Sequence, residues 1–195
     1  MAIKELTEGT YCWCPTEKIP SDICNKLIKS ADGYFKNHKL IGKQDDKVRK
    51  GQTFFDNQPW VYDLVWKYME DSNMLAGWDF EISSAENYQI GKYTKDDFYG
   101  VHQDSIGTHA TKRLDESNPI LHNKTRKISM SLILNNDFEG GRVRISLQNN
   151  HHIDMKEQGK GNMIFFPSFQ FHEVTPVTQG TRYSLVMWFL GSPWR

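Results

Sequence analysis

The spacing of apolar residues along the chain predicts helices first and strands afterwards. Between residues 21 and 37, apolar side chains recur at helical spacing behind Ser21, which is a suitable N-cap residue. A second helix is predicted to begin at Pro59, because proline fits the first helical position, and its apolar spacing continues to residues 74–77. A short strand is predicted between the two helices, at residues 52–55.

From residue 78 onward, short runs rich in β-branched and aromatic residues alternate with Gly, Asn and Pro. The expected strands are 78–83, 86–93, 98–103, 126–134, 142–147, 162–166, 171–175 and 181–190. A turn is predicted at 137–141, and the long polar loop 105–124 is expected to be a mobile lid that orders when substrate binds. Helices followed by strands without intervening helices favour one closed or two-layered antiparallel β unit with the helices packed outside.

Composition narrows the class of protein. Of the 195 residues, 38% are hydrophobic and 25% are charged, which is typical of a globular chain able to bury an ordinary core. Lys and Arg number 24 and Asp and Glu also number 24, so the formal net charge is zero. This balance argues against a nucleic-acid or anionic-membrane partner. The apolar run at 185–190 is far shorter than the ~20 residues that span a bilayer, so no membrane partner is expected.

The amino terminus and the cysteines indicate a cytoplasmic protein. Residues 1–5 contain no apolar stretch of the kind that a secretion signal needs. The 3 cysteines form an odd set without a Cys-x-x-Cys motif. This pattern argues against a disulfide framework and for reduced thiols.

Three polar side chains form a candidate metal site. His102 and Asp104 are two residues apart on a predicted strand, so their side chains point to the same face. His172 begins a later strand-like run and supplies the third ligand of a facial site with two histidines and one carboxylate, which suits Fe(II). The other histidines lie in polar loops and have a structural or surface interpretation: His38, His109, His122, His151 and His152.

Arg182 is the second unusual feature, because it lies on an aromatic-rich strand where a buried cation is costly unless an anion meets it. The anion is either a protein carboxylate in a structural ion pair or the far carboxylate of a dicarboxylate ligand. Strand periodicity puts Ser184 on the same face, where its hydroxyl can share the anion. Tyr93 and Tyr99 precede the His-x-Asp pair, and each is also compatible with plain strand packing.

Taken in their order along the chain, His102-x-Asp104, His172 and Arg182 resemble the motifs of the Fe(II)/2-oxoglutarate-dependent dioxygenases. The resemblance is closer to the prolyl 4-hydroxylase-like branch with its bacterial and phage relatives. Residues 92–104 are similar to that branch's Tyr-x-x-Gly-x-x-Tyr-x-x-His-x-Asp, with Asp96 in the place of the glycine. A strand ending in Leu-Asn and a Gly-Gly turn, both within 126–141, also resemble motifs of that branch, and so does the closing block 166–182. The resemblance covers about residues 78–190.

The resemblance implies a mainly β fold with flanking helices. Its core is a double-stranded β-helix, or jelly roll, over 78–190, packed against two helices within 1–77. We expect these parts to form a single domain over 1–195. The family also implies three ligands for Fe(II): His102, Asp104 and His172.

The second cofactor that the resemblance implies is 2-oxoglutarate. Arg182 would pair with its distal carboxylate, and Tyr93 would hydrogen-bond to the same co-substrate. Ser184 is a further candidate contact. No catalytic residue beyond the metal ligands is implied.

The function expected from the resemblance is hydroxylation of a substrate C–H with release of succinate and CO2. Peptidyl proline is the favoured substrate, and another protein side chain or a small molecule stays open, as does the oligomeric state. One alternative is a catalytically silent jelly-roll module that keeps the metal and ligand sites. Another is a zinc-dependent hydrolase, although the buried arginine has no evident use there. A nucleic-acid demethylase is permitted by the basic stretches 36–52 and 112–127 and opposed by the zero net charge.

Overall fold

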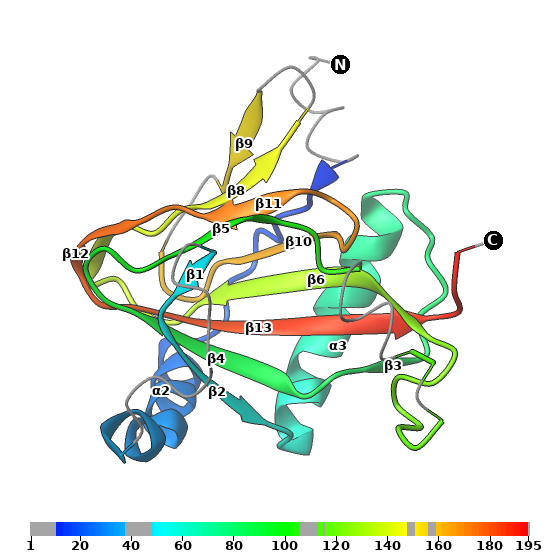
Figure 1. Ribbon diagram of the computed structural model, residues 1–195, viewed down its shortest axis with the longest axis horizontal. Coiled ribbons are helices and arrows are strands. Elements are labelled where there is room, and N and C mark those ends of the chain that lie inside the picture. The colour runs from blue at the N-terminus through cyan, green and yellow to red at the C-terminus, as the bar shows by residue number, and fades with distance from the viewer. Residues whose placement is uncertain are drawn as a thin grey trace.

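A computed structural model of the protein describes the following parts of the chain: residues 11–37, 48–105, 113–114, 116–147, 151–155 and 159–194. Two helices lie where the apolar spacing predicts them, α2 at Ser21–Asn37 and α3 at Pro59–Leu75 (Figure 1). About half of the remaining described chain forms antiparallel strands. Within these described ranges, no helix combines the length and apolarity needed to cross a membrane.

The strands form two main sheets and one small one. The six-stranded sheet contains β10 (Met163–Pro167), β6 (Thr125–Ile133), β13 (Arg182–Gly191), β4 (Tyr88–Tyr93) and β2 (Gln52–Asp56) in that order, with β3 (Ser84–Ala85) paired to β13. The five-stranded sheet contains β1 (Arg49–Lys50), β5 (Phe98–His102), β11 (His172–Val174), β8 (Val143–Ser146) and β9 (His152–Asp154). The small sheet pairs β12 (Val177–Gly180) with β7 (Phe138–Gly140).

Both helices pack against one face of the six-stranded sheet. A single buried apolar cluster joins residues of α2, of α3 and of the sheet: Leu27, Ala31, Val61, Val65, Met69, Ile90, Ile128, Leu132, Leu185 and Phe189. The helical members recur every three or four residues, which is the spacing that keeps one helix face against the sheet. Most of the stability of such helices comes from this packing rather than from their own backbone.

Strand β13 separates the helix-covered core from the space between the two main sheets. Leu185, Met187 and Phe189 belong to the core against the helices. Arg182 and Ser184 point the other way and line a cavity. Because successive side chains of a strand point to opposite faces, a shift of one residue in pairing would exchange these two sets. The neighbours β4 and β6 hold β13 in one register along most of its length.

One strand prediction and one turn prediction are wrong. Residues 78–83 are all described and form no strand, because Asp79 has a φ of 51° that interrupts an extended run. The side chain of Asn73 instead takes both backbone hydrogen bonds of Phe80, at 2.9 and 3.0 Å. Conversely, the turn predicted at 137–141 contains β7, because long-range pairing with β12 outweighs the local turn signals.

Other predictions lie outside the described residues. They concern residues 106–112 and 115 of the loop at 105–124, and the two histidines His38 and His109. The lid therefore stays a prediction.

We expect Leu27→Ala to lower the free energy of unfolding by about 2–5 kcal/mol, because Leu27 is fully buried between α2 and the sheet. The measurement is urea unfolding followed by circular dichroism. Lys29→Ala is the matched control, since Lys29 is exposed on the same helix, and it should change stability by no more than about 0.5 kcal/mol. Equal stabilities of the two variants would show that α2 is not packed as described.

Candidate active site

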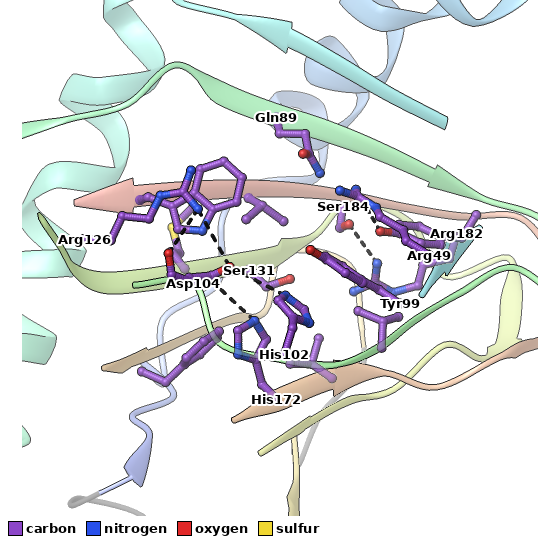
Figure 2. Close-up of a pocket in the computed structure, with 17 residues that line it drawn as sticks. Arg49, Gln89, Tyr99, His102, Asp104, Arg126, Ser131, His172, Arg182 and Ser184 are labelled. Carbon is purple, nitrogen blue, oxygen red and sulfur yellow. Dashed lines mark hydrogen bonds and ion pairs between the residues drawn. The ribbon is translucent and has the colours of Figure 1, made fainter. Parts of the chain in front are cut away.

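A cavity of about 210 Å³ lies between the two main sheets (Figure 2). Residues of β1, β5, β8 and β11 line it from the five-stranded sheet, and residues of β4, β6, β10 and β13 line it from the six-stranded sheet. The cavity brings together all six site residues expected from the sequence: Tyr93, His102, Asp104, His172, Arg182 and Ser184.

The two histidines and the aspartate meet at one wall of this cavity. His102 at the end of β5 lies directly across from His172 at the start of β11. Asp104 follows β5, and its backbone N–H donates to the carbonyl of Ser168 at 2.9 Å. The carboxylate oxygens of Asp104 lie 3.6 Å from Nε2 of His102 and 3.4 Å from Nε2 of His172. One ligand atom from each of the three residues lies within 4.8 Å of the others, which is close enough to share a metal ion.

The imidazoles are oriented by their own strands. Nδ1 of His102 lies 2.8 Å from the carbonyl oxygen of Gly100, and Nδ1 of His172 lies 2.9 Å from that of Gln170. A carbonyl oxygen only accepts, so each Nδ1 carries the proton and each Nε2 keeps its lone pair for a metal. Burial lowers the pKa of His172, which favours the neutral form that binds metals.

The Asp104 carboxylate accepts a hydrogen bond from one buried serine, which a second buried serine contacts in turn. The hydroxyl of Ser129 on β6 donates to Oδ2 of Asp104 at 2.6 Å, and the hydroxyl of Ser168 lies 2.9 Å from that of Ser129. Burial by itself would raise the pKa of Asp104. The nearby His172, His102 and Arg126 have the larger combined effect and lower this pKa well below its usual range. The carboxylate is therefore ionised, and two imidazoles with one carboxylate are the donor set that suits Fe(II).

Aromatic rings confine both imidazoles. The Tyr99 ring stacks on His102 with centroids 3.6 Å apart and an interplanar angle of 17°, and the Phe166 ring lies 4.5 Å from that of His172. Burial raises the pKa of Tyr99, so its phenol stays protonated. These contacts limit the rotation of the ligand rings and leave the side of the triad that faces the cavity open.

Arg182 marks the opposite end of the cavity, to the right of the triad in Figure 2. Its side chain is only 1% exposed, and its Nη1 donates to the hydroxyl of Ser184 at 2.7 Å. Among the described residues, its Nε and Nη2 atoms have no hydrogen-bond partner. Burial lowers the pKa of Arg182 to about 10, which still leaves it charged at neutral pH. A buried cation with free donors is a site for an anion.

Glycines make room for this end of the cavity. Gly141 has a φ of 57°, and a Cβ atom added there would lie 2.8 Å from Cδ of Arg182. A Cβ atom added at Gly91 would lie 2.9 Å from the ring of Tyr93, which is paired with Arg182 across β4 and β13. The Gly-Gly turn found in the sequence therefore has a packing role beside the buried arginine.

Arg126 lines the cavity near the triad but is already neutralised. Its Nε and Nη2 atoms each lie 2.6 Å from a carboxylate oxygen of Glu86. Its guanidinium also lies over the Trp188 ring at 3.9 Å and within 3.9 Å of an Asp104 oxygen. These contacts contrast with Arg182, which has no carboxylate partner among the described residues.

Sequence reasoning alone misses several residues of the site and its cavity. Ser129 and Ser131 alternate with large apolar residues on β6, and this polar alternation in an apolar strand is a signal that could have identified Ser129. Gln89 follows the same rule on β4, where it is 3% exposed. Arg49 lies in a stretch rich in Lys and Arg, and no local pattern separates it from its neighbours.

The family model of the 2OG-Fe(II) oxygenase superfamily matches residues 88–190, more than half of the chain. This segment contains the triad, Tyr93, Arg182 and Ser184. The chain belongs to the 2OG-Fe(II) oxygenase superfamily, as its motifs indicate. Fe(II) and 2-oxoglutarate are the cofactors of this superfamily, and the donor set of the triad and the cationic end of the cavity fit them.

Known relatives are prolyl 4-hydroxylase-like. A protein of Acanthamoeba polyphaga mimivirus, provisionally named a prolyl 4-hydroxylase, is 22% identical over 177 residues, which cover 85% of this chain and 68% of that protein. The chain spans about two fifths of the length of the bacterial PKHD-type hydroxylases that it also matches.

Solved structures share the fold. A prolyl-4-hydroxylase of Pseudomonas putida has a TM-score of 0.68 and 20% identity, over 94% of this chain and 95% of that one. The viral collagen prolyl hydroxylase from Paramecium Bursaria Chlorella virus-1, in a 2OG complex, has a TM-score of 0.67 and 19% identity, over 94% and 98% of the two chains.

We expect Ser129→Ala to weaken Fe(II) binding by about 10- to 100-fold, because it removes the donor that orients the Asp104 carboxylate. The measurement is anaerobic titration of the metal-free protein with Fe(II). Ser131→Ala is the matched control, since Ser131 lies two residues along the same strand and lines the cavity without a bond to the triad. If the two variants bind Fe(II) equally well, Ser129 does not orient the carboxylate.

Proposed function

We propose that this protein is an Fe(II)- and 2-oxoglutarate-dependent oxygenase that hydroxylates a C–H bond of its substrate. In this proposal, His102, Asp104 and His172 bind Fe(II). Membership of the 2OG-Fe(II) oxygenase superfamily supports it, and so does the convergence of three ligand atoms within 4.8 Å. The fold that we propose for this activity is a jelly roll made by the two main sheets, within a single domain.

The observation that carries the proposal is the buried guanidinium of Arg182 in the same cavity as the triad. Two of its nitrogens have no partner among the described residues. A dicarboxylate that chelates a metal at one end and reaches Arg182 at the other would supply the missing anion. A planar guanidinium matches a carboxylate through two parallel hydrogen bonds, which explains an arginine at this position rather than a lysine.

The residues of this chain have binding and orienting roles in the reaction. When bound, Fe(II) supplies the oxidation chemistry, in which O2, 2-oxoglutarate and a substrate C–H give a C–OH, succinate and CO2. Arg182, Ser184 and Tyr93 orient the co-substrate, and the apolar side chains of the cavity exclude water. The Nδ1–carbonyl bonds of the two histidines keep their Nε2 atoms unprotonated.

We propose a peptide as substrate, with peptidyl proline as the residue to test first. The support is the prolyl hydroxylase names of the relatives and of the solved structures with the same fold. One of those structures is a Trichoplax adhaerens prolyl hydroxylase in complex with a peptide fragment. The test is mass spectrometry of ¹⁸O transfer from ¹⁸O2 across a panel of peptides and metabolites. A protein that binds 2-oxoglutarate but does not turn it over, either with any compound of the panel or without one, would instead be a catalytically silent module.

We expect His102→Ala to abolish Fe(II) binding and 2-oxoglutarate turnover while the protein stays folded, because His102 lies at the cavity wall and not in the apolar core. The measurements are Fe(II) titration, succinate release and circular dichroism. His152→Ala, an exposed histidine on β9, is the control and should behave as wild type. Turnover at the wild-type rate by the His102 variant would overturn the ligand assignment.

We expect Arg182→Ala to weaken 2-oxoglutarate binding by roughly 100-fold or more, since each charge-assisted hydrogen bond contributes about 1.5–3 kcal/mol. Arg182→Lys keeps the charge but loses the planar fork, so its affinity should be intermediate. Fe(II) affinity without co-substrate should stay at the wild-type value in both variants.

The measurement for Arg182 is titration of the anaerobic Fe(II) protein with 2-oxoglutarate, following the charge-transfer band of the chelate. Arg144→Ala is the matched control, because Arg144 pairs with Asp154 at 2.7 Å and does not line the cavity. Wild-type affinity in Arg182→Ala would contradict the co-substrate assignment.

A further inference from the structure

A second arginine, Arg49 of β1, reaches the co-substrate end of the cavity from the five-stranded sheet. It is paired with Tyr99 of β5, and its guanidinium lies over the Tyr99 ring at 4.5 Å. Its Nη2 donates to the hydroxyl of Tyr93 at 3.1 Å. Among the described residues, no carboxylate pairs with Arg49, so its charge is available to the cavity.

The bond from Arg49 determines what the Tyr93 hydroxyl can do. A phenol has one hydrogen to donate, and its oxygen can accept. Here the oxygen accepts from Arg49, and within the described part of the chain the Tyr93 hydrogen is donated to no acceptor. Tyr93 is 3% exposed and lines the cavity, so the hydrogen is left for a group inside it.

The position of the Tyr93 ring is confined, so its hydroxyl cannot swing away. A Cβ atom added at Gly51 would come within 3.0 Å of one edge of the ring, and one added at Gly91 would come within 2.9 Å of the other edge. Two guanidinium groups also lie near the ring, with Cζ of Arg49 6.0 Å and Cζ of Arg182 5.7 Å from its centroid. Both cations favour an anion beside this phenol.

We infer that Arg49 is a positioning residue for the co-substrate: by donating to the Tyr93 oxygen, it turns the Tyr93 hydrogen toward the carboxylate that Arg182 binds. The inference rests on the proposed function and adds a residue to it from outside the segment matched by the family model. Arg49 acts through Tyr93, and the contact of its guanidinium with the Tyr99 ring helps to hold it in position.

A double-mutant cycle tests this role. Arg49→Met removes the donor and the charge while keeping an unbranched side chain, and Tyr93→Phe removes the hydroxyl. Each single variant should weaken binding of 2-oxoglutarate to the anaerobic Fe(II) protein by about tenfold, the effect of one charge-assisted hydrogen bond. In the Tyr93→Phe background, Arg49→Met should cost no more than about a further threefold, because the two residues act on the same bond.

Two controls separate positioning from a general structural effect. Lys50→Met changes the other residue of β1, which is 44% exposed, pairs with Asp97 at 3.6 Å and does not line the cavity. It should leave 2-oxoglutarate affinity at the wild-type value. Fe(II) affinity without co-substrate should also stay unchanged in Arg49→Met, whereas a collapse of the Tyr99–His102 stack would lower it.

The outcomes distinguish this inference from the proposed function. If the wild-type Fe(II) protein shows no charge-transfer band with 2-oxoglutarate, both are overturned. If wild type binds and Arg182→Ala does not, but Arg49→Met binds as tightly as wild type, the inference alone is overturned. If the losses of affinity in the two single variants multiply fully in the double variant, Arg49 acts independently of Tyr93 and the inference is overturned. A parallel loss of Fe(II) affinity in Arg49→Met would place the effect of Arg49 on the metal site and would also overturn the inference.

Discussion

The burial of Arg182 is the constraint that organises the cavity. A guanidinium with 1% exposure and a single hydroxyl partner is unfavourable in a protein interior unless a ligand supplies the counter-charge. The surroundings accommodate it without a protein carboxylate: Gly141 leaves space beside its stem, and Tyr93 lies across from it in the next strand. An acidic residue here would stabilise the empty protein and compete with an anionic ligand. The cavity therefore has the uncompensated positive charge of Arg182 at one end and the triad, with the negative charge of Asp104, at the other.

Strand β13 couples this end to the rest of the fold. The side chains that alternate with Arg182 and Ser184 are buried against the helices, so the site and the main apolar core share one backbone. Loss of packing beneath the sheet would be transmitted directly to the position of the guanidinium. The helices lie outside the segment matched by the family model, yet they support the strand that carries Arg182.

Local signals in the sequence predict the two helices and most strands, and the order of the motifs predicts the superfamily. Arg182 stands out because its charge contradicts an apolar strand, and His102 and Asp104 stand out because they are two residues apart. The sequence does not reveal contacts that depend on pairing between distant segments. Arg49 reaches Tyr93 only because β1 pairs with β5, and the segment at 78–83 avoids a strand because Asn73 captures its backbone. Neither the contact of Arg49 with Tyr93 nor that of Asn73 with the backbone of Phe80 is recognisable from local periodicity.

Each of the two imidazoles is hydrogen-bonded to a backbone carbonyl two residues earlier in the chain, that of Gly100 for His102 and that of Gln170 for His172. Such a bond does not depend on the side chain at either accepting position. Each of these hydrogen bonds lies within three residues of the chain, Gly100–His102 and Gln170–His172, and does not depend on which other side chains line the cavity. Substitutions at other positions of the cavity wall can therefore change its shape and polarity without removing either hydrogen bond.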